Sequence, residues 1–464
     1  MNKTSEENKT GMNRRDFLRQ AGYSALGGMV ATAIPKSVGA ALTPDPFVGK
    51  SSSHDWGFWK KVQKAFILDP KKVYMNIGTT GSMPRRVLKN YNRYNKLVAR
   101  DPWDMGGEWG HFPYLAEFIE YIAPQFGADP EELVLSRNTT DGMCTIIGGL
   151  KFESGNEILT THHEHVGGIS PMYMVRDRYG VTIKELEIPV FPESDEDFVN
   201  LFDKYLSKAK RRAKLKLIVF SHITYKTGTR LPAKKICEIA NSYGIPTLID
   251  GAHAPGMLNL DFHDIGCDFY AGSGHKWQCG PGATGLIYLR KDSPNNVPDY
   301  YAINSSLYPY PDYFNLATQL QYVGNDNYPA KRALRDSCEM WETIGRDRIE
   351  EYVLSLSSHC KQRIKETFGD DTVIYSPDIP EFSSGLTSFN PFDDQTDLVK
   401  LNEFRDRLRE EYGFIIRTTD FKIKNNDEYD THALRISTHL FHNHRQVDDL
   451  VEAMYDLYRD MINN

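Results

Sequence analysis

The sequence has few cysteines, and their arrangement predicts neither disulfides nor a zinc site. The six cysteines among 464 residues are spread between positions 144 and 360, and none forms a C-x-x-C pair. Disulfide-rich secreted domains and zinc ribbons use dense, regularly spaced cysteines. We therefore expect unpaired, buried thiols, as in a protein that folds in a reducing compartment.

The sequence also lacks an excess of positive charge. It has 55 Lys and Arg residues against 62 Asp and Glu residues, a formal net charge of −7. Because proteins that bind nucleic acids or anionic membrane surfaces depend on basic surfaces, we expect no nucleic-acid partner. Internal repeats, low-complexity tracts and a late apolar run long enough to cross a membrane are also missing from the sequence.

The first forty residues have the pattern of an export signal. Arg14-Arg15 precede a weakly apolar run from Ala21 to Ile34, which is followed by the small residues Val38-Gly39-Ala40. Paired arginines before a short apolar stretch and a small-residue cleavage site are typical of twin-arginine signals. We predict residues 1–40 as a twin-arginine signal peptide, with export machinery as a partner, a periplasmic location and no membrane anchoring after cleavage. A basic amphipathic first helix is the alternative.

The length of the chain favours two domains that share a large core. Residues 41–75 are predicted as an N-terminal arm that contributes to the small domain. Residues 76–304 are predicted as the large domain and residues 305–464 as a small C-terminal α+β domain. In the C-terminal part we expect a strand at 433–438 between amphipathic helices at 403–412 and 445–461.

Alternating strands and helices in the middle of the chain predict an α/β fold. Leu215–Ser221 is an apolar strand, Pro232–Tyr243 is a helix that ends before Gly244, and Pro246–Asp250 is a second strand. A strand, helix and strand in this order form a βαβ unit, which implies a mostly parallel sheet covered by helices. Residues 284–289 add a further apolar strand.

Asp250 and Lys276 are the strongest candidates for chemistry. Asp250 ends a predicted strand, at the edge where ligands bind in parallel α/β sheets. Lys276 follows Ser273-Gly274-His275 in a mostly apolar stretch, and desolvation would lower the pKa of its amine and make it nucleophilic. A carboxylate next to a protonated pyridine nitrogen makes that ring an electron sink. Each feature alone is usually structural, and their ordered combination points to a pyridoxal-phosphate site.

The same residues resemble a known family. Ile249-Asp250-Gly251-Ala252-His253, followed by the run from Cys267 to Lys276, is similar to the signature of class V aminotransferases. This group of fold type I enzymes includes cysteine desulfurases and isopenicillin N epimerase-like proteins. The resemblance extends from about Asn76 to Asn443 and implies a pyridoxal 5'-phosphate cofactor and a homodimer.

The resemblance implies a role for each matching position. Lys276 matches the lysine that carries the cofactor as an imine, Asp250 the partner of the ring nitrogen, and His165 the imidazole that stacks on the ring. The other cofactor-binding positions are Asn138, Thr139, Thr140, His253, Ser273, His275 and Asn325. Substrate-binding positions are Arg435, which would clamp a carboxylate through two hydrogen bonds, and Asn76 and Gly78 of an N-terminal substrate loop.

Two departures from the family pattern matter. Cysteine desulfurases have a catalytic cysteine in the loop near Ile415–Thr419, whereas the last cysteine of this chain is Cys360. A desulfurase that forms a persulfide is therefore not expected. Asn325 stands where the family usually has Gly-Thr, a phosphate contact made across the dimer, and an Asn side chain can still donate a hydrogen bond.

The run His162-His163-Glu164-His165 offers a competing interpretation as a metal site. On a strand, His163 and His165 would face one way and His162 the other. Because the sequence has no second group of ligands, we predict no metal.

The sequence leaves the reaction open. The favoured function is an exported enzyme that acts at the α-carbon of a small-molecule or peptide-like amino-acid substrate, by transamination, epimerisation or β-elimination. The signal peptide adds a resemblance to periplasmic enzymes that tailor pyoverdine siderophores. One alternative is a C–S lyase, and another is a non-catalytic periplasmic binding protein on a degenerate fold of the same type.

Overall fold

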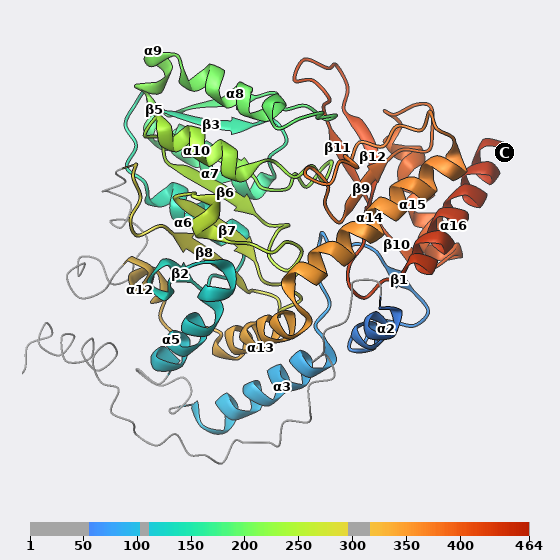
Figure 1. The fold of residues 1–464 in the computed structure, drawn as a ribbon, viewed down its shortest axis with the longest axis horizontal. Coiled ribbons are helices and arrows are strands. Elements are labelled where there is room, and N and C mark those ends of the chain that lie inside the picture. Colours follow the sequence, from blue (N-terminus) through green and yellow to red (C-terminus); the bar gives the residue numbers. More distant parts are fainter. Residues whose placement is uncertain (1–54, 103–110, 296–315, 464) are drawn as a thin grey trace, which may run out of the picture.

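The computed structural model describes residues 55–102, 111–295 and 316–463, which form a large lobe and a smaller C-terminal lobe (Figure 1). A seven-stranded sheet lies in the large lobe, with the order β2-β8-β7-β6-β5-β3-β4. Its strands are β2 Leu133–Val134, β3 Glu157–Thr161, β4 Thr182–Leu186, β5 Leu215–Ser221, β6 Thr247–Gly251, β7 Phe269–Ser273 and β8 Gly285–Leu289.

Most of this sheet is parallel. Strands β4, β3, β5, β6 and β7 run in one direction, while β8 is antiparallel to both β7 and β2. The carboxyl ends of the parallel strands therefore meet at one edge, which faces the smaller lobe (Figure 1).

Strand β5 shows why the predicted strands are apolar at nearly every position. Leu217 and Val219 pack into one buried cluster, whereas Ile218 and Phe220 belong to another. Because neighbouring side chains of a strand point to opposite faces, a sheet covered by helices on both faces needs apolar residues at both sets of positions. The covering helices are α6 Thr139–Gly149, α7 Val166–Tyr179, α8 Glu196–Leu206, α10 Ala233–Ser242 and α11 Phe262–Ile265, and the short helix α9 Ala209–Arg212 follows α8.

The smaller lobe is built around an antiparallel sheet of order β11-β12-β9, with β9 Leu386–Phe389, β11 Arg417–Phe421 and β12 Thr431–Ser437. Three helices accompany it: α14 Arg346–Phe368, α15 Leu398–Glu411 and α16 His444–Asn463. The described part of the N-terminal arm lies against this lobe. In the arm, β1 Val73–Tyr74 pairs with β10 Phe414–Ile415, and Trp59 of α2 Trp56–Lys64 stacks on Tyr352 at 3.8 Å between ring centroids.

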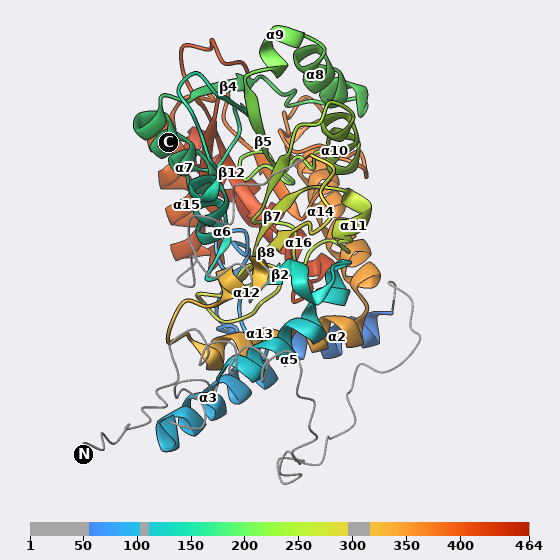
Figure 2. The ribbon, with the colours of Figure 1, turned by 90° about the vertical axis from the view of Figure 1, so that its left-hand side faces the viewer.

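The remaining helices gather at one end of the molecule. Figure 2 shows α3 Arg85–Arg100, α5 His111–Ile122 and α13 Tyr328–Ile344 side by side, at the end opposite α8 and α9. Short elements complete the described chain: the 3₁₀ turns Ala123–Phe126 and Pro130–Glu132, and α12 Leu316–Gln321, which contacts β2. None of the helices described in 55–102, 111–295 and 316–463 is both long and apolar enough to cross a membrane.

The strand placement considered for the metal-site interpretation of His162–His165 does not hold. The run His162–His165 does not continue a strand, because β3 ends at Thr161 and the chain turns into α7, whose N-cap is His165. Glu164 causes the turn: its carboxylate accepts hydrogen bonds from the Thr161 hydroxyl at 2.6 Å and from the backbone N–H of Ser221 at 3.0 Å. The predicted signal peptide, residues 1–40, lies outside the described residues.

Candidate active site

A cavity of about 300 Å³ lies where the carboxyl ends of the parallel strands face β11 and β12. Its lining residues come from both lobes and are Gly78, Thr79, Asn138, Thr139, Thr140, His165, Tyr225, Asp250, Ala252, His253, Ser273, His275, Lys276, Arg417 and Arg435. The structure thus brings together nearly all the side chains that the sequence singled out, and it adds Thr79, Tyr225, Ala252 and Arg417.

One end of the cavity is suited to a phosphate. Asn138 caps α6 by accepting a hydrogen bond from the Asp141 N–H at 2.8 Å, and Thr139 lies in the first turn. The Thr139 hydroxyl is 2.7 Å from the hydroxyl of Ser273 at the end of β7. Free backbone N–H groups at a helix N-terminus and converging hydroxyls are donors for a phosphate. Asp141 does not repel an anion strongly, because it is paired with Arg137.

His275 closes this end of the cavity. Its Nδ1 donates to the carbonyl oxygen of Thr284 at 3.2 Å, so the neutral ring presents an unprotonated Nε2. Burial lowers the pKa of His275, and a neighbouring phosphate would oppose that shift by favouring the charged ring.

Asp250 lies at the end of β6 and is only 4% exposed. One of its oxygens accepts a hydrogen bond from the Ala252 N–H at 3.0 Å. Burial raises the pKa of the carboxyl, whereas this hydrogen bond and the charge of Lys276 lower it. A buried carboxylate with so few donors is suited to a cationic N–H partner in the cavity. Glu164 lies close to Asp250, and its carboxylate is occupied by the hydrogen bonds that hold the turn before α7. Burial raises the pKa of Glu164 to about 7.

Lys276 directs its amine into the cavity from the loop after β7. Burial, Arg435 and Arg417 lower the pKa of this amine to about 8, against the opposite effect of Asp250. The loop is held by a hydrogen bond of 2.7 Å from the Gly81 N–H to the carbonyl oxygen of His275. A Cβ at Gly81 would overlap the backbone carbonyl of Lys276, so the close approach requires glycine.

Two neutral histidines present N–H groups. The Trp277 Nε1–H, which can only donate, binds Nδ1 of His253 at 3.2 Å, and the Gly167 N–H binds Nδ1 of His165 at 3.0 Å. Each neutral ring therefore carries its proton on Nε2. Burial, with Lys276 nearby, lowers the pKa of His165 to about 4 and that of His253 well below its usual value.

Arg435 is the most buried cation of the cavity, at 1% exposure. Its Nη1 donates to the Tyr225 carbonyl at 2.8 Å and its Nη2 to the Thr79 hydroxyl at 3.4 Å, while Nε has no hydrogen-bond partner among the described residues. Burial, followed by the charge of Arg417, lowers its pKa to about 9. A buried guanidinium without a carboxylate is costly, so this arrangement favours binding of an anion.

Two predicted residues do not line the cavity. Asn76 supports it from outside, since its side-chain oxygen accepts a hydrogen bond from the Thr79 hydroxyl at 2.9 Å. Asn325 lies in a separate hollow of about 480 Å³, together with Arg137 and Asp141. The contact of Asn325 with a partner subunit's phosphate stays a prediction.

Sequence reasoning missed Tyr225 and Arg417 as site residues. Tyr225 lies edge-on to His165, with 4.9 Å between ring centroids. Arg417 is directly opposite Arg435 across β11 and β12. No local signal around Arg417 marks it as a site residue, because it meets Arg435 only through the pairing of two separate strands.

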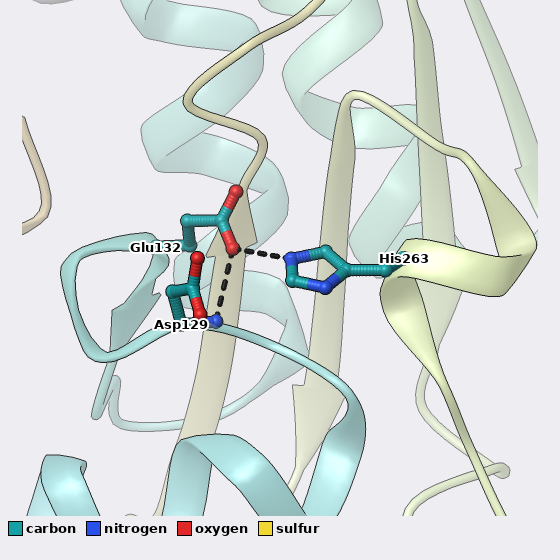
Figure 3. Close-up of side chains that lie close together, drawn as sticks. All are labelled: Asp129, Glu132 and His263. Carbon is teal, nitrogen blue, oxygen red and sulfur yellow. Dashed lines mark hydrogen bonds and ion pairs between the residues drawn. The ribbon is translucent and has the colours of Figure 1, made fainter.

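A group of possible metal ligands lies elsewhere, at Asp129, Glu132 and His263 (Figure 3). Glu132 accepts hydrogen bonds from His263 Nε2 at 2.6 Å and from the backbone N–H groups of Asp129 and Lys291, both at 3.0 Å. Asp129 is paired with the Lys291 ammonium. Since protein donors already satisfy these carboxylates, the group is a structural clamp between the segment before β2 and α11.

Comparisons with known proteins agree with this geometry. The aminotransferase class-V family profile matches residues 73–450. An isopenicillin N epimerase from Streptomyces clavuligerus is 27% identical over 408 residues, 85% of this chain and 97% of the relative. A cysteine desulfurase from Escherichia coli O8 is 25% identical over 342 residues, 71% of this chain and 78% of the relative.

Solved structures show the same fold. A cystine C–S lyase in complex with cysteine persulfide superposes with a TM-score of 0.70 at 22% identity, covering 83% of this chain and 98% of the lyase. A variant of that lyase carries glycine covalently linked to its pyridoxal-phosphate cofactor. A cysteine desulfurase from Escherichia coli gives a TM-score of 0.69 at 19% identity, over 87% of this chain and 98% of the desulfurase.

The sheet order, the small antiparallel sheet and these likenesses define a fold type I pyridoxal-phosphate enzyme. Within that class, the chain belongs to the aminotransferase class-V family, whose profile covers most of its length. The family and the cofactor-linked structural neighbour imply pyridoxal phosphate, and the phosphate end, Asp250 and Lys276 fit that group.

Proposed function

We propose that this protein is an exported pyridoxal-phosphate enzyme that acts at the α-carbon of an amino acid, or of an amino-acid residue within a secreted metabolite. The observation that carries the proposal is the arrangement around Lys276: its amine, with a pKa lowered to about 8, shares a cavity with buried Asp250 and Arg435. Similarity to isopenicillin N epimerases supports action at an α-carbon.

Pyridoxal phosphate, when bound, supplies a ring that withdraws electrons from the substrate's α-carbon. Lys276 would hold the cofactor covalently, Asp250 would keep a proton on its ring nitrogen, and Asn138, Thr139, Thr140, Ser273 and His275 would hold its phosphate. The Nε2–H of His253 provides a donor for a ring oxygen, and His165 provides a flat ring for stacking.

The chain's own residues account for binding and proton transfer at the substrate. Arg435 would orient a carboxylate through its fork of N–H donors, which fixes the α-carbon relative to Lys276. An amine with a pKa of about 8 is well matched to accept and return the α-proton near neutral pH. Return of a proton to the opposite face of the α-carbon would give epimerisation, whereas its delivery to an atom other than the α-carbon would give transamination.

The second candidate is a C–S lyase. A putative L-cysteine desulfhydrase from Oryza sativa is 29% identical over 277 residues, 56% of this chain. All six cysteines lie in the described residues and none lines the cavity; five are buried, and Cys144 faces the separate hollow. An elimination reaction needs no protein thiolate, unlike persulfide formation.

The two candidates are separated by products. The loaded enzyme, incubated with L-cysteine, L-cystine and a panel of other amino acids, should exchange the α-proton of its substrate with deuterium from solvent without releasing sulfide. Release of pyruvate, together with sulfide from cysteine or cysteine persulfide from cystine, with no exchange in the other amino acids, would favour the lyase.

Location and assembly belong to the same proposal. We propose that residues 1–40 direct export through the twin-arginine route to the periplasm, where the enzyme tailors a siderophore-like metabolite. We also propose a homodimer in which Asn325 reaches the partner's phosphate site. The position of Asn325 outside its own cavity, beside the exposed side chain of Val323, supports a role between subunits.

A further inference from the structure

Two guanidinium groups meet at the wall of the cavity opposite Lys276. Arg417 and Arg435 are direct cross-strand partners in the antiparallel pair β11 and β12. Both reach the same hydroxyl, Thr79 Oγ1, at 3.5 Å from Arg417 Nη1 and 3.4 Å from Arg435 Nη2. Like charges directly opposite each other destabilise a sheet, so an anion bound between the two guanidiniums would stabilise the pair.

The described part of the protein supplies no such anion. None of the ion pairs among the described residues includes Arg417 or Arg435. Among the lining residues Asp250 is the only carboxylate, against the three cations Lys276, Arg417 and Arg435. Asp250 is assigned to the ring nitrogen of the cofactor. The negative charge that neutralises the two arginines would therefore come from the substrate.

The two arginines differ in depth. Arg435 is 1% exposed and its Nε lacks a partner among the described residues, whereas Arg417 is exposed and uses its Nε on the Thr418 carbonyl at 3.1 Å. Arg435 therefore lies at the inner wall and Arg417 at the mouth, with the Thr79 hydroxyl between them. One carboxylate bound at the inner position would leave the Nη2 group of Arg417 available further out.

We propose that Arg417 binds a second carboxylate, so that the site selects an amino acid, or an amino-acid residue of a larger molecule, that carries two carboxylates. The inference rests on the proposed function, in which Arg435 receives the α-carboxylate. It assigns the side-chain carboxylate of an aspartate-like or glutamate-like substrate to the mouth of the cavity.

The test compares acids with their uncharged amides. The cofactor-loaded wild type and Arg417→Gln are titrated with L-aspartate, L-asparagine, L-glutamate and L-glutamine, and binding is followed by the visible absorption of the cofactor. The wild type should bind at least one acid about tenfold more tightly than its amide, and Arg417→Gln should remove that preference by weakening acid binding more than amide binding. Arg445→Gln, on the exposed surface of α16, is the matched control and should behave as the wild type.

The other outcomes of this titration separate failure of the two-carboxylate inference from failure of the proposed function. Equal binding of acids and amides by the loaded wild type would overturn the inference and leave the proposed function intact. An equal loss for acids and amides in Arg417→Gln would mean that Arg417 and Arg435 share one carboxylate, which also overturns it. A wild type that forms no covalent link between Lys276 and pyridoxal phosphate would overturn the proposed function itself.

A second measurement does not depend on the cofactor. Succinate and glutarate should raise the thermal midpoint of the apoprotein more than acetate and butyrate at equal ionic strength, because only the dicarboxylates bridge the two arginines. Arg417→Gln should abolish this difference, and Arg417→Lys should retain part of it. Equal shifts for mono- and dicarboxylates in the wild type would contradict a two-carboxylate site.

Discussion

Burial gives Lys276 its reactivity. An ammonium is disfavoured in a desolvated cavity that also holds two guanidiniums, so the amine loses its proton about two pH units more easily than an exposed lysine. The sequence predicted this residue because a lysine follows Ser-Gly-His close after a predicted strand end. Arg417 was missed because its neighbour in space, Arg435, is 18 positions away on another strand, and pairing register is not a local property of the sequence.

The first prediction concerns the pH dependence of cofactor attachment. Only the neutral amine attacks an aldehyde, and Lys276 is mostly protonated below its pKa of about 8. The rate at which the apoprotein forms its borohydride-reducible adduct with pyridoxal phosphate should therefore rise with pH and level off above about 8. Stopped-flow absorbance over a pH series measures this rate. A rate that continues to rise to about pH 10 would indicate an ordinary exposed lysine.

The second prediction concerns Arg435. Charge-assisted hydrogen bonds are typically worth about 1.5–3 kcal/mol, so Arg435→Ala should weaken amino-acid binding by roughly ten- to a hundredfold. Titration of the loaded protein, followed by its visible absorption, gives the two affinities. The same affinity in wild type and Arg435→Ala would remove this residue from the substrate site and favour a large, peptide-like substrate held by other contacts.

Secondary-structure elements were predictable where local sequence alone determines them, as in strands buried on both faces and in helices bounded by Pro and Gly. Strand β5 occupies the predicted range, because helices cover both faces of the sheet and the apolar side chains from Leu217 to Phe220 are buried on alternate faces. Helix α10 follows Pro232 and ends before Gly244, as those residues indicate. The turn at His162–His165 was not predictable, because it depends on a hydrogen bond from Ser221, which lies 57 positions from Glu164.

The third prediction concerns the loop that carries Lys276. A methyl group at Gly81 would overlap the Lys276 carbonyl, whereas Gly282 has open space around its Cβ position. Gly81→Ala should therefore lower stability by about 1–3 kcal/mol and reduce cofactor occupancy, while Gly282→Ala should change neither. Urea unfolding and the ratio of visible to 280 nm absorbance measure the two effects. Normal occupancy in Gly81→Ala would show that this loop does not position the lysine.

The predicted division into domains rests on the change of pattern along the chain and stays a prediction, whereas the contacts between parts of the chain were not predictable from the sequence. The described arm segment joins the C-terminal lobe through β1 and β10, while α12 and α13 contact β2, α3 and α5. Such pairings join residues hundreds of positions apart, and the amphipathic pattern of a helix does not name its partner. Assembly with a second subunit is a further step beyond the sequence.

The fourth prediction concerns assembly. If the hollow around Asn325 is an interface, a charge at Val323, which is 60% exposed, should separate the subunits and reduce cofactor occupancy. Val399, which is 80% exposed on α15, provides the matched control. Sedimentation velocity should show a dimer for the wild type and Val399→Glu, and mostly monomer for Val323→Glu. A monomeric, fully loaded wild type would contradict the proposed homodimer.

The fifth prediction concerns export. Arg14→Lys together with Arg15→Lys should leave the folded, loaded protein in the cytoplasm, because the twin-arginine route depends on the paired arginines. Fractionation of cells that express both forms measures the distribution. Continued export of the double variant would contradict the twin-arginine interpretation of residues 1–40.

The central claim is that Lys276 carries the cofactor, and one measurement tests it most directly. The purified protein is reduced with borohydride, digested and analysed by mass spectrometry, and the reduced cofactor should be attached to the peptide that contains Lys276. The visible absorption band should disappear on reduction and should be absent from Lys276→Ala. A Lys276→Ala variant that keeps the same borohydride-sensitive band, or a cofactor attached to another lysine, would contradict the account.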